Sequence, residues 1–339
     1  MIRPLLPALA AALLAMPVAG VAQDRPTYGP RLEGYDYPYP VRTFAFESQR
    51  QPLEMTYMDV TPTGPANGRT AVLLHGKNFC AATWAPTIAV LAQAGFRVIA
   101  IDQIGFCKAS KPAAYQFSLP QLATNTHDLL AGLDIDRAVV IGHSMGGMLA
   151  ARFALQHPEA VEQLVLVNPI GLEDWQAEGV PYASLDTAFA NERRTTFDSI
   201  KAYQQKVYYD GQWRAGYDEP VAMLAGMYAG PGGDAVAWNQ AQTSDMIFTQ
   251  PVVHEFGRIN APTTLIIGGT DRTAPGANRA SPEIQARLGQ YPALGRRTAQ
   301  AIPDATLVEF SDLGHAPQTQ DPARFHDALL AALENSPQT

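Results

Sequence analysis

A serine flanked by glycines stands where an apolar segment of the chain meets a segment of small residues. Residues 142–146 read Gly-His-Ser-Met-Gly, with an apolar run at 137–141 before them and small residues continuing to Ala151. This order predicts a strand, a sharp turn that carries Ser144, and then a helix. Glycines let neighbouring backbone pass close to a serine in a strained conformation. We therefore expect the hydroxyl at the end of a buried sheet, above a helix N-terminus.

The surroundings of this motif favour chemistry over a plain glycine-rich turn. A helical pattern at 119–133 precedes the strand, and a second apolar strand at 163–168 follows the helix. A short glycine–serine pattern by itself also arises by chance. Strand–helix–strand context on both sides is what a nucleophilic serine of this kind requires.

Such a serine needs a base that accepts its proton and a third group that orients the base. Asp271 follows the predicted strand at 264–268, and His315 follows the predicted strand at 306–310. Both therefore lie at the sheet edge where Ser144 emerges. Serine, aspartate and histidine also occur in the chain order of one known hydrolase architecture. We predict these three residues to be catalytic.

Other polar residues at strand ends receive different interpretations. His143 adjoins the serine, but neighbours on a tight turn point apart, so a packed and hydrogen-bonded histidine is expected. His75 ends a strand and should shape the loop that follows it. Asp102 ends the strand at 97–102 and should tie the next loop together by hydrogen bonds. These residues are the competing candidates for the catalytic base and acid, and we expect each of them to have a structural role.

Acyl transfer through a serine also needs two N–H donors for the negatively charged oxygen of the intermediate. We expect one from the backbone of Met145 and the other from the loop after His75, at Lys77 or else at Asn78. The side chain of Lys77 is then free, and we expect it to be solvated. The alternative is that it lines the entrance and favours a negatively charged substrate. No cofactor is needed. A metal site is not expected, because the cysteines and histidines lack metal-ligand spacing.

The N-terminus reads as a targeting segment. A basic start at Arg3 leads into an apolar stretch at 5–21, and small residues precede Gln23. We predict a signal peptide at 1–22, with a membrane anchor as the alternative. The whole chain carries a net charge of −8 and has no basic run. This composition argues against nucleic-acid binding and against a stable attachment to an anionic membrane.

Beyond the signal segment, the pattern predicts an α/β protein. An extended arm covers 23–40, strands are expected at 41–48, 53–60, 70–74 and 97–102, and a helix at 81–94. Alternation of strands and helices then implies a parallel sheet covered on both faces. Residues 169–253 contain helical pieces but no buried strand. The pattern resumes with a strand at 262–268, one long helical stretch at 282–301 and a final helix at 322–333.

These pieces together resemble the α/β-hydrolase superfamily, in the branch with a helical cap. The matching segments are 73–76, 102–106, 141–147, 265–271 with Pro275, and 314–315 with 321–322. The resemblance implies a mostly parallel eight-stranded sheet flanked by helices, with a helical cap inserted after strand 6. It divides the chain into a core at 41–168 and 254–339 and a cap at 169–253. In some relatives the acid follows the sixth strand, where this chain has Asn168.

Departures from the family pattern narrow the expected chemistry. Relatives that open epoxides or remove halide carry aspartate at the position of Ser144. Relatives that hydrolyse carbon–carbon bonds often have asparagine at the position of His143. Proline-releasing peptidases usually carry His-Gly-Gly-Pro-Gly where residues 75–79 read His-Gly-Lys-Asn-Phe. The pattern therefore looks most like that of esterases and cofactor-free perhydrolases.

The two cysteines of the chain are Cys80 and Cys107. In the family fold their loops follow neighbouring strands and leave the same edge of the sheet. Relatives usually have glycine at the position of Cys107, which suggests a special role for this thiol. An exported protein meets an oxidising compartment. The resemblance therefore makes a Cys80–Cys107 disulfide the candidate, with two buried free thiols as the alternative.

We expect an exported, periplasmic serine hydrolase that cleaves a carboxylic ester or lactone through an acyl-enzyme on Ser144. The partner is a small molecule, expected to be apolar or aromatic because the cap is rich in aromatic side chains. Carbon–carbon or amide hydrolysis by the same residues, and a ligand-binding protein on the same scaffold, are the alternatives. The oligomeric state is left open. Candidate substrate contacts are Phe79, His143, Trp175, Tyr182, Tyr208 and Met223.

Overall fold

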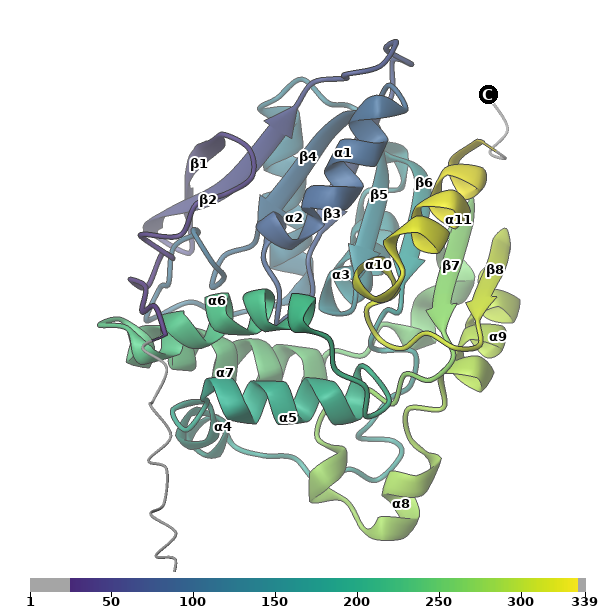
Figure 1. Cartoon of the computed structure of the whole chain (residues 1–339). Helices are drawn as coiled ribbons and strands as arrows, with labels where there is room; N and C mark the ends of the chain where they lie inside the picture. The colour runs from purple at the N-terminus through teal and green to yellow at the C-terminus, as the bar shows by residue number, and fades with distance from the viewer. Residues whose placement is uncertain (1–24, 335–339) are drawn as a thin grey trace, which may run out of the picture.

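The computed structural model describes residues 25–334, and its centre is an eight-stranded sheet (Figure 1). The predicted signal peptide, residues 1–22, lies outside the described residues. Along the sheet the strand order is β1-β2-β4-β3-β5-β6-β7-β8. The strands are β1 (Val41–Ser48), β2 (Gln51–Val60), β3 (Thr70–Leu74), β4 (Arg97–Asp102), β5 (Ala138–His143), β6 (Val161–Val167), β7 (Thr263–Gly268) and β8 (Ala305–Phe310).

Strand direction follows from the hydrophobic pattern. β1 and β2 form an antiparallel hairpin, and β2 pairs antiparallel with β4. From β4 to β8 all neighbours are parallel, as the continuous apolar runs of strands buried on both faces predict. The fold class and the strands predicted from the sequence are confirmed, with ends that differ by a few residues. Parallel strands bring the residues that follow β5, β7 and β8 to one edge.

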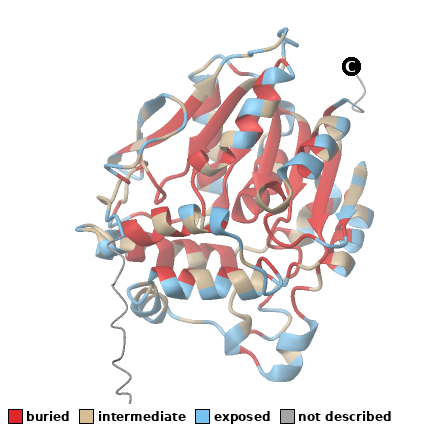
Figure 2. Cartoon of the chain, in the orientation of Figure 1, coloured by how far each residue is buried: buried red, intermediate tan, exposed pale blue. Residues whose placement is uncertain are grey.

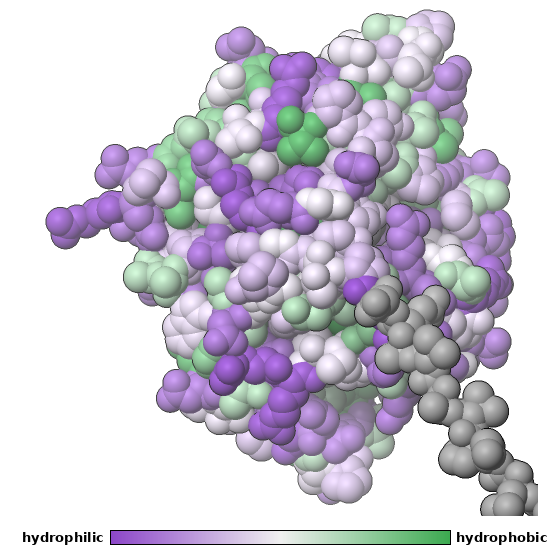
Figure 3. Space-filling view, turned by 60° about the vertical axis from the view of Figure 1, so that its left-hand side comes forward, coloured by the Kyte–Doolittle hydropathy of each residue, from purple (hydrophilic) through white to green (hydrophobic). Residues whose placement is uncertain are grey.

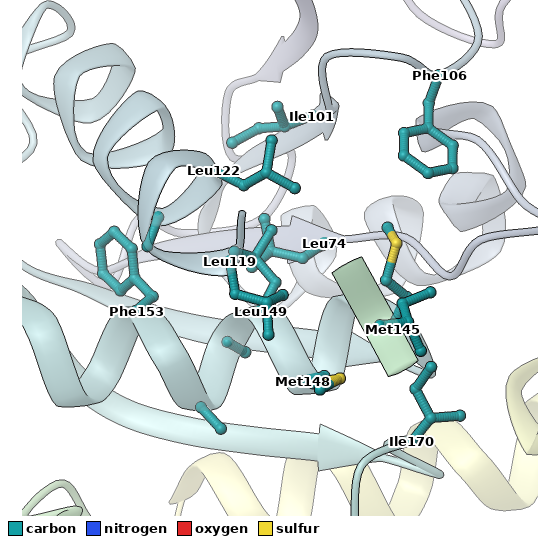
Figure 4. Close-up of a cluster of buried hydrophobic side chains, with 14 of the residues drawn as sticks. Leu74, Ile101, Phe106, Leu119, Leu122, Met145, Met148, Leu149, Phe153 and Ile170 are labelled. Carbon is teal, nitrogen blue, oxygen red and sulfur yellow. The ribbon is translucent and has the colours of Figure 1, made fainter. Parts of the chain in front are cut away.

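Helices cover both faces of the sheet. Successive strand residues point to opposite sides. Leu73 therefore shares a buried cluster with α1 (Ala85–Gln93) and α11 (Pro322–Glu334), whereas Leu74 shares one with α2 (Leu119–Ala131) and α3 (Met145–Gln156). Figure 4 shows the second layer, with Leu74 close to Leu149. Figure 2 shows that the central strands β3 to β7 are buried, whereas the edge strands β1 and β8 are mostly exposed or half-buried. Two further helices beside the sheet are α9 (Tyr291–Ala301) and α10 (Pro317–Gln320).

Between β6 and β7 the described chain is helical and lies across one end of the sheet (Figure 1). Its helices are α4 (Leu185–Glu192), α5 (Phe197–Val207), α6 (Asp218–Ala229) and α7 (Gly233–Thr249). We call residues 169–253 the helical insertion. Part of the N-terminal arm packs against it, since the N–H of Tyr28 donates to the carbonyl of Gly226. The division of the chain into core and cap stays a prediction.

One predicted element is wrong in the structure. The single helical stretch expected at 282–301 is two helices, α8 (Pro282–Arg287) and α9, separated by a bend at Gly289. Gly289 has a φ of 63°, which favours glycine, and its N–H donates to Oε1 of Glu173. A tertiary partner therefore interrupts a segment whose local pattern continues. Short 3-10 turns are η1 (Ala81–Trp84), η2 (Pro158–Ala160), η3 (Ala215–Tyr217), η4 (Val253–Arg258) and η5 (Ala277–Arg279).

The outer surface is largely hydrophilic on the face drawn in Figure 3, with hydrophobic residues scattered among polar ones. Within residues 25–334, no helix combines the length and the apolar character that crossing a bilayer requires.

Candidate active site

Ser144 lies on the sharp turn between β5 and α3. Its backbone has φ 56° and ψ −119°, a conformation that non-glycine residues rarely adopt. The flanking glycines make this turn possible. A Cβ at Gly142 would collide with the carbonyl oxygen of Gly146, and one at Gly146 would collide with that of Leu74. The strand–turn–helix predicted from the sequence is therefore present, and it holds the hydroxyl above the first turn of α3.

His315 approaches Ser144 from the loop after β8. Its Nε2 lies 2.9 Å from Oγ of Ser144, and its Nδ1 lies 2.6 Å from Oδ2 of Asp271. A carboxylate accepts hydrogen bonds only, so Nδ1 carries the proton and Nε2 is free to accept the serine proton. The backbone holds the loop as well, because the N–H of His315 donates to the carbonyl of Tyr208 over 2.9 Å.

Asp271 follows β7 and is fully buried together with His315. Besides His315 it receives three hydrogen bonds. Oδ1 accepts from the backbone N–H and the hydroxyl of Thr273, over 2.8 and 2.6 Å, and Oδ2 accepts from Nδ2 of Asn168 over 2.9 Å. Several donors to one carboxylate compensate for its removal from water. The sequence did not point to Thr273 or to this use of Asn168.

The other two histidines near the site are buried and hydrogen-bonded to the backbone. Nε2 of His143 donates to the carbonyl of His315 over 2.8 Å. Burial above all, and then the charge of His315, hold the pKa of His143 well below its usual value. Nδ1 of His75 donates to the carbonyl of Gly76, and its Nε2 accepts from the N–H of Gln103. Burial also lowers the pKa of His75. Both imidazoles therefore stay neutral and fix loops around the serine.

The loop after β3 runs close to the serine, as a donor to the oxyanion must. A Cβ at Gly76 would lie 2.9 Å from Cβ of Ser144, and the next residue, Lys77, lines the same cavity as Ser144. Met145 is the first residue of α3, and the first N–H groups of a helix have no intrahelical acceptor. The backbone groups of Lys77 and Met145 stay the predicted oxyanion donors.

Ser144 opens into a cavity of about 340 Å³ beneath the helical insertion. Apolar side chains from the insertion line one part of it, among them Ile200, Leu224 and Phe248. The expectation that the side chain of Lys77 is solvated is wrong. Its Nζ lies 2.8 Å from Oε1 of Glu192, and the two side chains are only 20% and 17% exposed. Glu192 is the last residue of α4 and lies 115 positions away from Lys77 in the sequence. No local sequence pattern therefore indicated this ion pair.

The six predicted substrate contacts occupy different environments. Tyr208 lines the cavity, and its ring centroid lies 4.2 Å from that of His315. Phe79 is buried beside Tyr208 and His143, whose own hydrogen bond is given above. Trp175 is buried and donates to Glu173, and Met223 is buried in α6. Tyr182 is 55% exposed and donates to Asp245. Their part in substrate binding stays a prediction.

Two groups of described side chains bring possible metal ligands within 4.8 Å of one another. They are Cys80 with Asp102 and Cys107, and His127 with His157 and Glu159. The two cysteines form a disulfide, with Cα atoms 5.8 Å apart, so neither offers a thiolate. Asp102 holds the adjoining loops by accepting from the N–H groups of Ala81 and Lys108, as predicted. No residue of either group is among those that line the cavity.

The family model described as the alpha/beta hydrolase fold matches residues 71–322, a span that includes all three predicted catalytic residues. The chain belongs to the α/β-hydrolase family. A solved structure of a probable hydrolytic enzyme from Pseudomonas aeruginosa PAO1 is 60% identical. That match covers 91% of this α/β hydrolase and 99% of the other chain, with a TM-score of 0.90.

Curated relatives match over different lengths. An uncharacterized protein from Mycobacterium tuberculosis is 41% identical over 106 residues, so the alignment covers 31% of this α/β hydrolase and 30% of that relative. A 2-hydroxy-6-oxononadienedioate/2-hydroxy-6-oxononatrienedioate hydrolase from Paraburkholderia xenovorans is 29% identical. Its alignment covers 78% of this chain and 86% of the relative.

Proposed function

We propose that this α/β hydrolase is an exported serine hydrolase that cleaves a carboxylic ester or lactone. The observation that carries the proposal is the contact of 2.9 Å between Nε2 of His315 and Oγ of Ser144. The hydrogen bond from Nδ1 of His315 to Asp271 leaves Nε2 as the proton acceptor. A base in this position turns a weakly nucleophilic hydroxyl into an effective one.

The proposed reaction uses each group twice. Oγ of Ser144 attacks the ester carbonyl while His315 takes its proton, and the N–H groups of Lys77 and Met145 stabilise the oxyanion. His315 then gives the proton to the departing alcohol, which leaves an acyl group on the serine. Water attacks this acyl-enzyme, again with His315 as the base, and releases the acid. Asp271 keeps the imidazole oriented and stabilises its charged form in both halves.

Carbon–carbon hydrolysis by the same three residues is the second candidate, and the Paraburkholderia relative named above is a hydrolase of a hydroxy-oxo dioate. The name describes a dioate, which carries two carboxylates. The charged residues among those that line the cavity here are Lys77, Glu192 and Arg279. Glu192 neutralises Lys77, which leaves Arg279 to balance a doubly negative ligand. One remaining cation does not balance two carboxylates, so this charge balance argues against a dicarboxylate substrate.

Export rests on two observations of different kinds. The sequence at 1–22 has the pattern of a signal peptide. The Cys80–Cys107 disulfide persists most readily in an oxidising compartment. We therefore place the mature protein in the periplasm.

The test is turnover of p-nitrophenyl esters by the mature protein and by Ser144→Ala. We expect wild-type activity and a loss of at least about 10⁴-fold in kcat for the variant. A fluorophosphonate should label the wild type at Ser144 alone. Labelling at a different serine would overturn the assignment. Tight binding of an ester with no turnover would identify a receptor on the hydrolase scaffold instead.

A further inference from the structure

The carboxylate of Glu192 is the point where the helical insertion meets the loop after β3, inside the cavity. Its Oε1 accepts from Nζ of Lys77 over 2.8 Å and from the hydroxyl of Ser244 over 3.4 Å. Its Oε2 accepts from the hydroxyl of Tyr228 over 2.6 Å. Lys77, Glu192, Tyr228 and Ser244 all line the cavity into which Ser144 opens. We call these four residues the polar cluster.

The polar cluster retains hydrogen-bonding capacity toward the cavity. A carboxylate offers about four lone-pair positions, and the contacts above occupy three. An ammonium has three donors, and Glu192 takes one of those of Lys77. Burial above all, and then Glu192, hold the pKa of Tyr228 well above its usual value, so its phenol stays a donor. The cluster can therefore accept one hydrogen bond and donate others.

The charges of the cluster cancel, which decides the kind of ligand it suits. A carboxylate on a substrate would gain from Lys77 but would face Glu192, and both partners would have to be desolvated. A neutral group that both donates and accepts meets the free capacity of both residues without that cost. Apolar side chains, among them Ile170, Ile200 and Leu224, line other parts of the same cavity and suit hydrocarbon.

We propose that Lys77 and Glu192 form a subsite for a neutral hydrogen-bonding group of the substrate, an amide or a hydroxyl, at a distance from the scissile carbonyl. The inference rests on the proposed hydrolase function and narrows its substrate class. The substrate is an uncharged ester or lactone with an apolar part and one such polar group. The rival explanation is that the ion pair only holds the loop that carries the backbone N–H of Lys77.

Three p-nitrophenyl esters with acyl chains of equal length separate these explanations. They are the heptanoate, the 4-acetamidobutanoate and the adipate monoester, whose far ends are apolar, neutral with an amide, and anionic. Wild-type enzyme is expected to favour the acetamido ester over the heptanoate about tenfold in kcat/KM, as a hydrogen bond to a charged group implies. The adipate monoester should be the poorest of the three.

Two variants should change the preference among the three esters, one by a loss and the other by a gain. Lys77→Met with Glu192→Leu replaces both charges by apolar side chains, and the ratio between acetamido ester and heptanoate should fall to about one. Glu192→Gln leaves Lys77 as an unbalanced cation, so kcat/KM for the adipate monoester should rise about tenfold relative to the heptanoate. The second variant is conservative and gives a gain, which misfolding cannot imitate.

Asp234→Asn is the matched control. Asp234 lies in α7 and pairs with Arg193, the residue that directly follows Glu192 and α4, but both side chains are exposed and neither lines the cavity. This variant should leave all three ratios unchanged. Equal losses on all three esters in both test variants would mean that the pair acts through the loop, and would overturn the subsite. If the wild type hydrolyses none of the esters in a Ser144-dependent way, the proposed function itself fails.

Discussion

Asn168 donates a hydrogen bond from Nδ2 to Oδ2 of Asp271 over 2.9 Å, while its own Oδ1 accepts from the N–H of Gly268. The two residues follow neighbouring strands, β6 and β7. Asn168 therefore occupies the place at which some members of the family carry the acid, and here it donates to the carboxylate that follows the next strand. Its amide supplies a donor to a buried carboxylate that already faces His315.

Asn168→Asp should destabilise the protein in a pH-dependent manner. Two buried carboxylates at hydrogen-bond distance cannot both ionise, so the folded-state pKa of one rises above its unfolded value of about 3.9. The stability that the shared proton supplies is lost as the pH rises through the raised pKa. We expect the variant to be less stable than wild type by about 2–4 kcal/mol at pH 8 and by less at pH 5. Urea unfolding of wild type and variant at both pH values measures this. Asn168→Ala is the comparison, because its stability difference from wild type should be the same at both pH values.

Asp271→Asn should preserve the fold and remove most activity. The amide can donate to Nδ1 of His315, which would favour the tautomer with its proton on Nε2, where Ser144 needs an acceptor. A loss of about 10⁴-fold in kcat is expected, as for the same change in a serine protease triad. Steady-state kinetics on a p-nitrophenyl ester, with thermal unfolding to confirm the fold, make the measurement. Retention of more than a tenth of the activity would rule out Asp271 as the orienting acid.

Gly146→Ala should destabilise the protein far more than the same substitution at a glycine with open space around it. Its Cβ would collide with the backbone of Leu74 and His75, which cannot move aside without displacing β3. We expect a loss of at least about 3 kcal/mol in the free energy of unfolding, or no folded protein at all. Gly216→Ala is the control, because a Cβ there meets no atom within 4 Å. Similar melting temperatures for the two variants would contradict the packing argument.

The Cys80–Cys107 disulfide should contribute substantially to stability. The two residues are 27 apart in the sequence, and closing a loop of this length restricts the unfolded chain by about 3.5 kcal/mol. Cys80→Ser with Cys107→Ser should therefore lower the melting temperature by several degrees. Protein recovered from the periplasm and denatured without reductant should show no titratable thiol. Two thiols per chain would refute the bridge in the exported protein.

Acidification below pH 6.5 should weaken the fold through His143 and His75. Burial holds the folded-state pKa of both below the usual value, whereas the unfolded chain binds protons at these imidazoles near pH 6.5. Stability is therefore full above pH 6.5 and falls as the pH drops, by up to about 1.4 kcal/mol per pH unit for each histidine. Urea unfolding at pH 7.5, 6 and 5 tests this. His143→Gln should reduce the slope, and an unchanged slope would exclude the residue as a contributor.

The positions of Ser144, Asp271 and His315 could be predicted because each follows a strand whose apolar pattern is unmistakable. Parallel strands in one sheet bring their carboxyl ends to one edge, so residues far apart in the chain converge there. The strand pattern is a local signal, and the glycines around Ser144 mark the turn directly. The catalytic roles of the three residues remain proposals, but their meeting follows from the order of the strands.

Other features depended on packing that no local pattern encodes. The break at Gly289 reflects a hydrogen bond to Glu173, and the pairing of Lys77 with Glu192 reflects how α4 crosses the loop after β3. Helices of the insertion can be recognised by their periodicity, but their periodicity does not say which residue of one faces which residue of another. The amino-acid sequence by itself thus determined the sheet and the edge where the candidate site forms. Only the tertiary structure decided what lines the cavity, because contacts between distant helices depend on how whole elements pack.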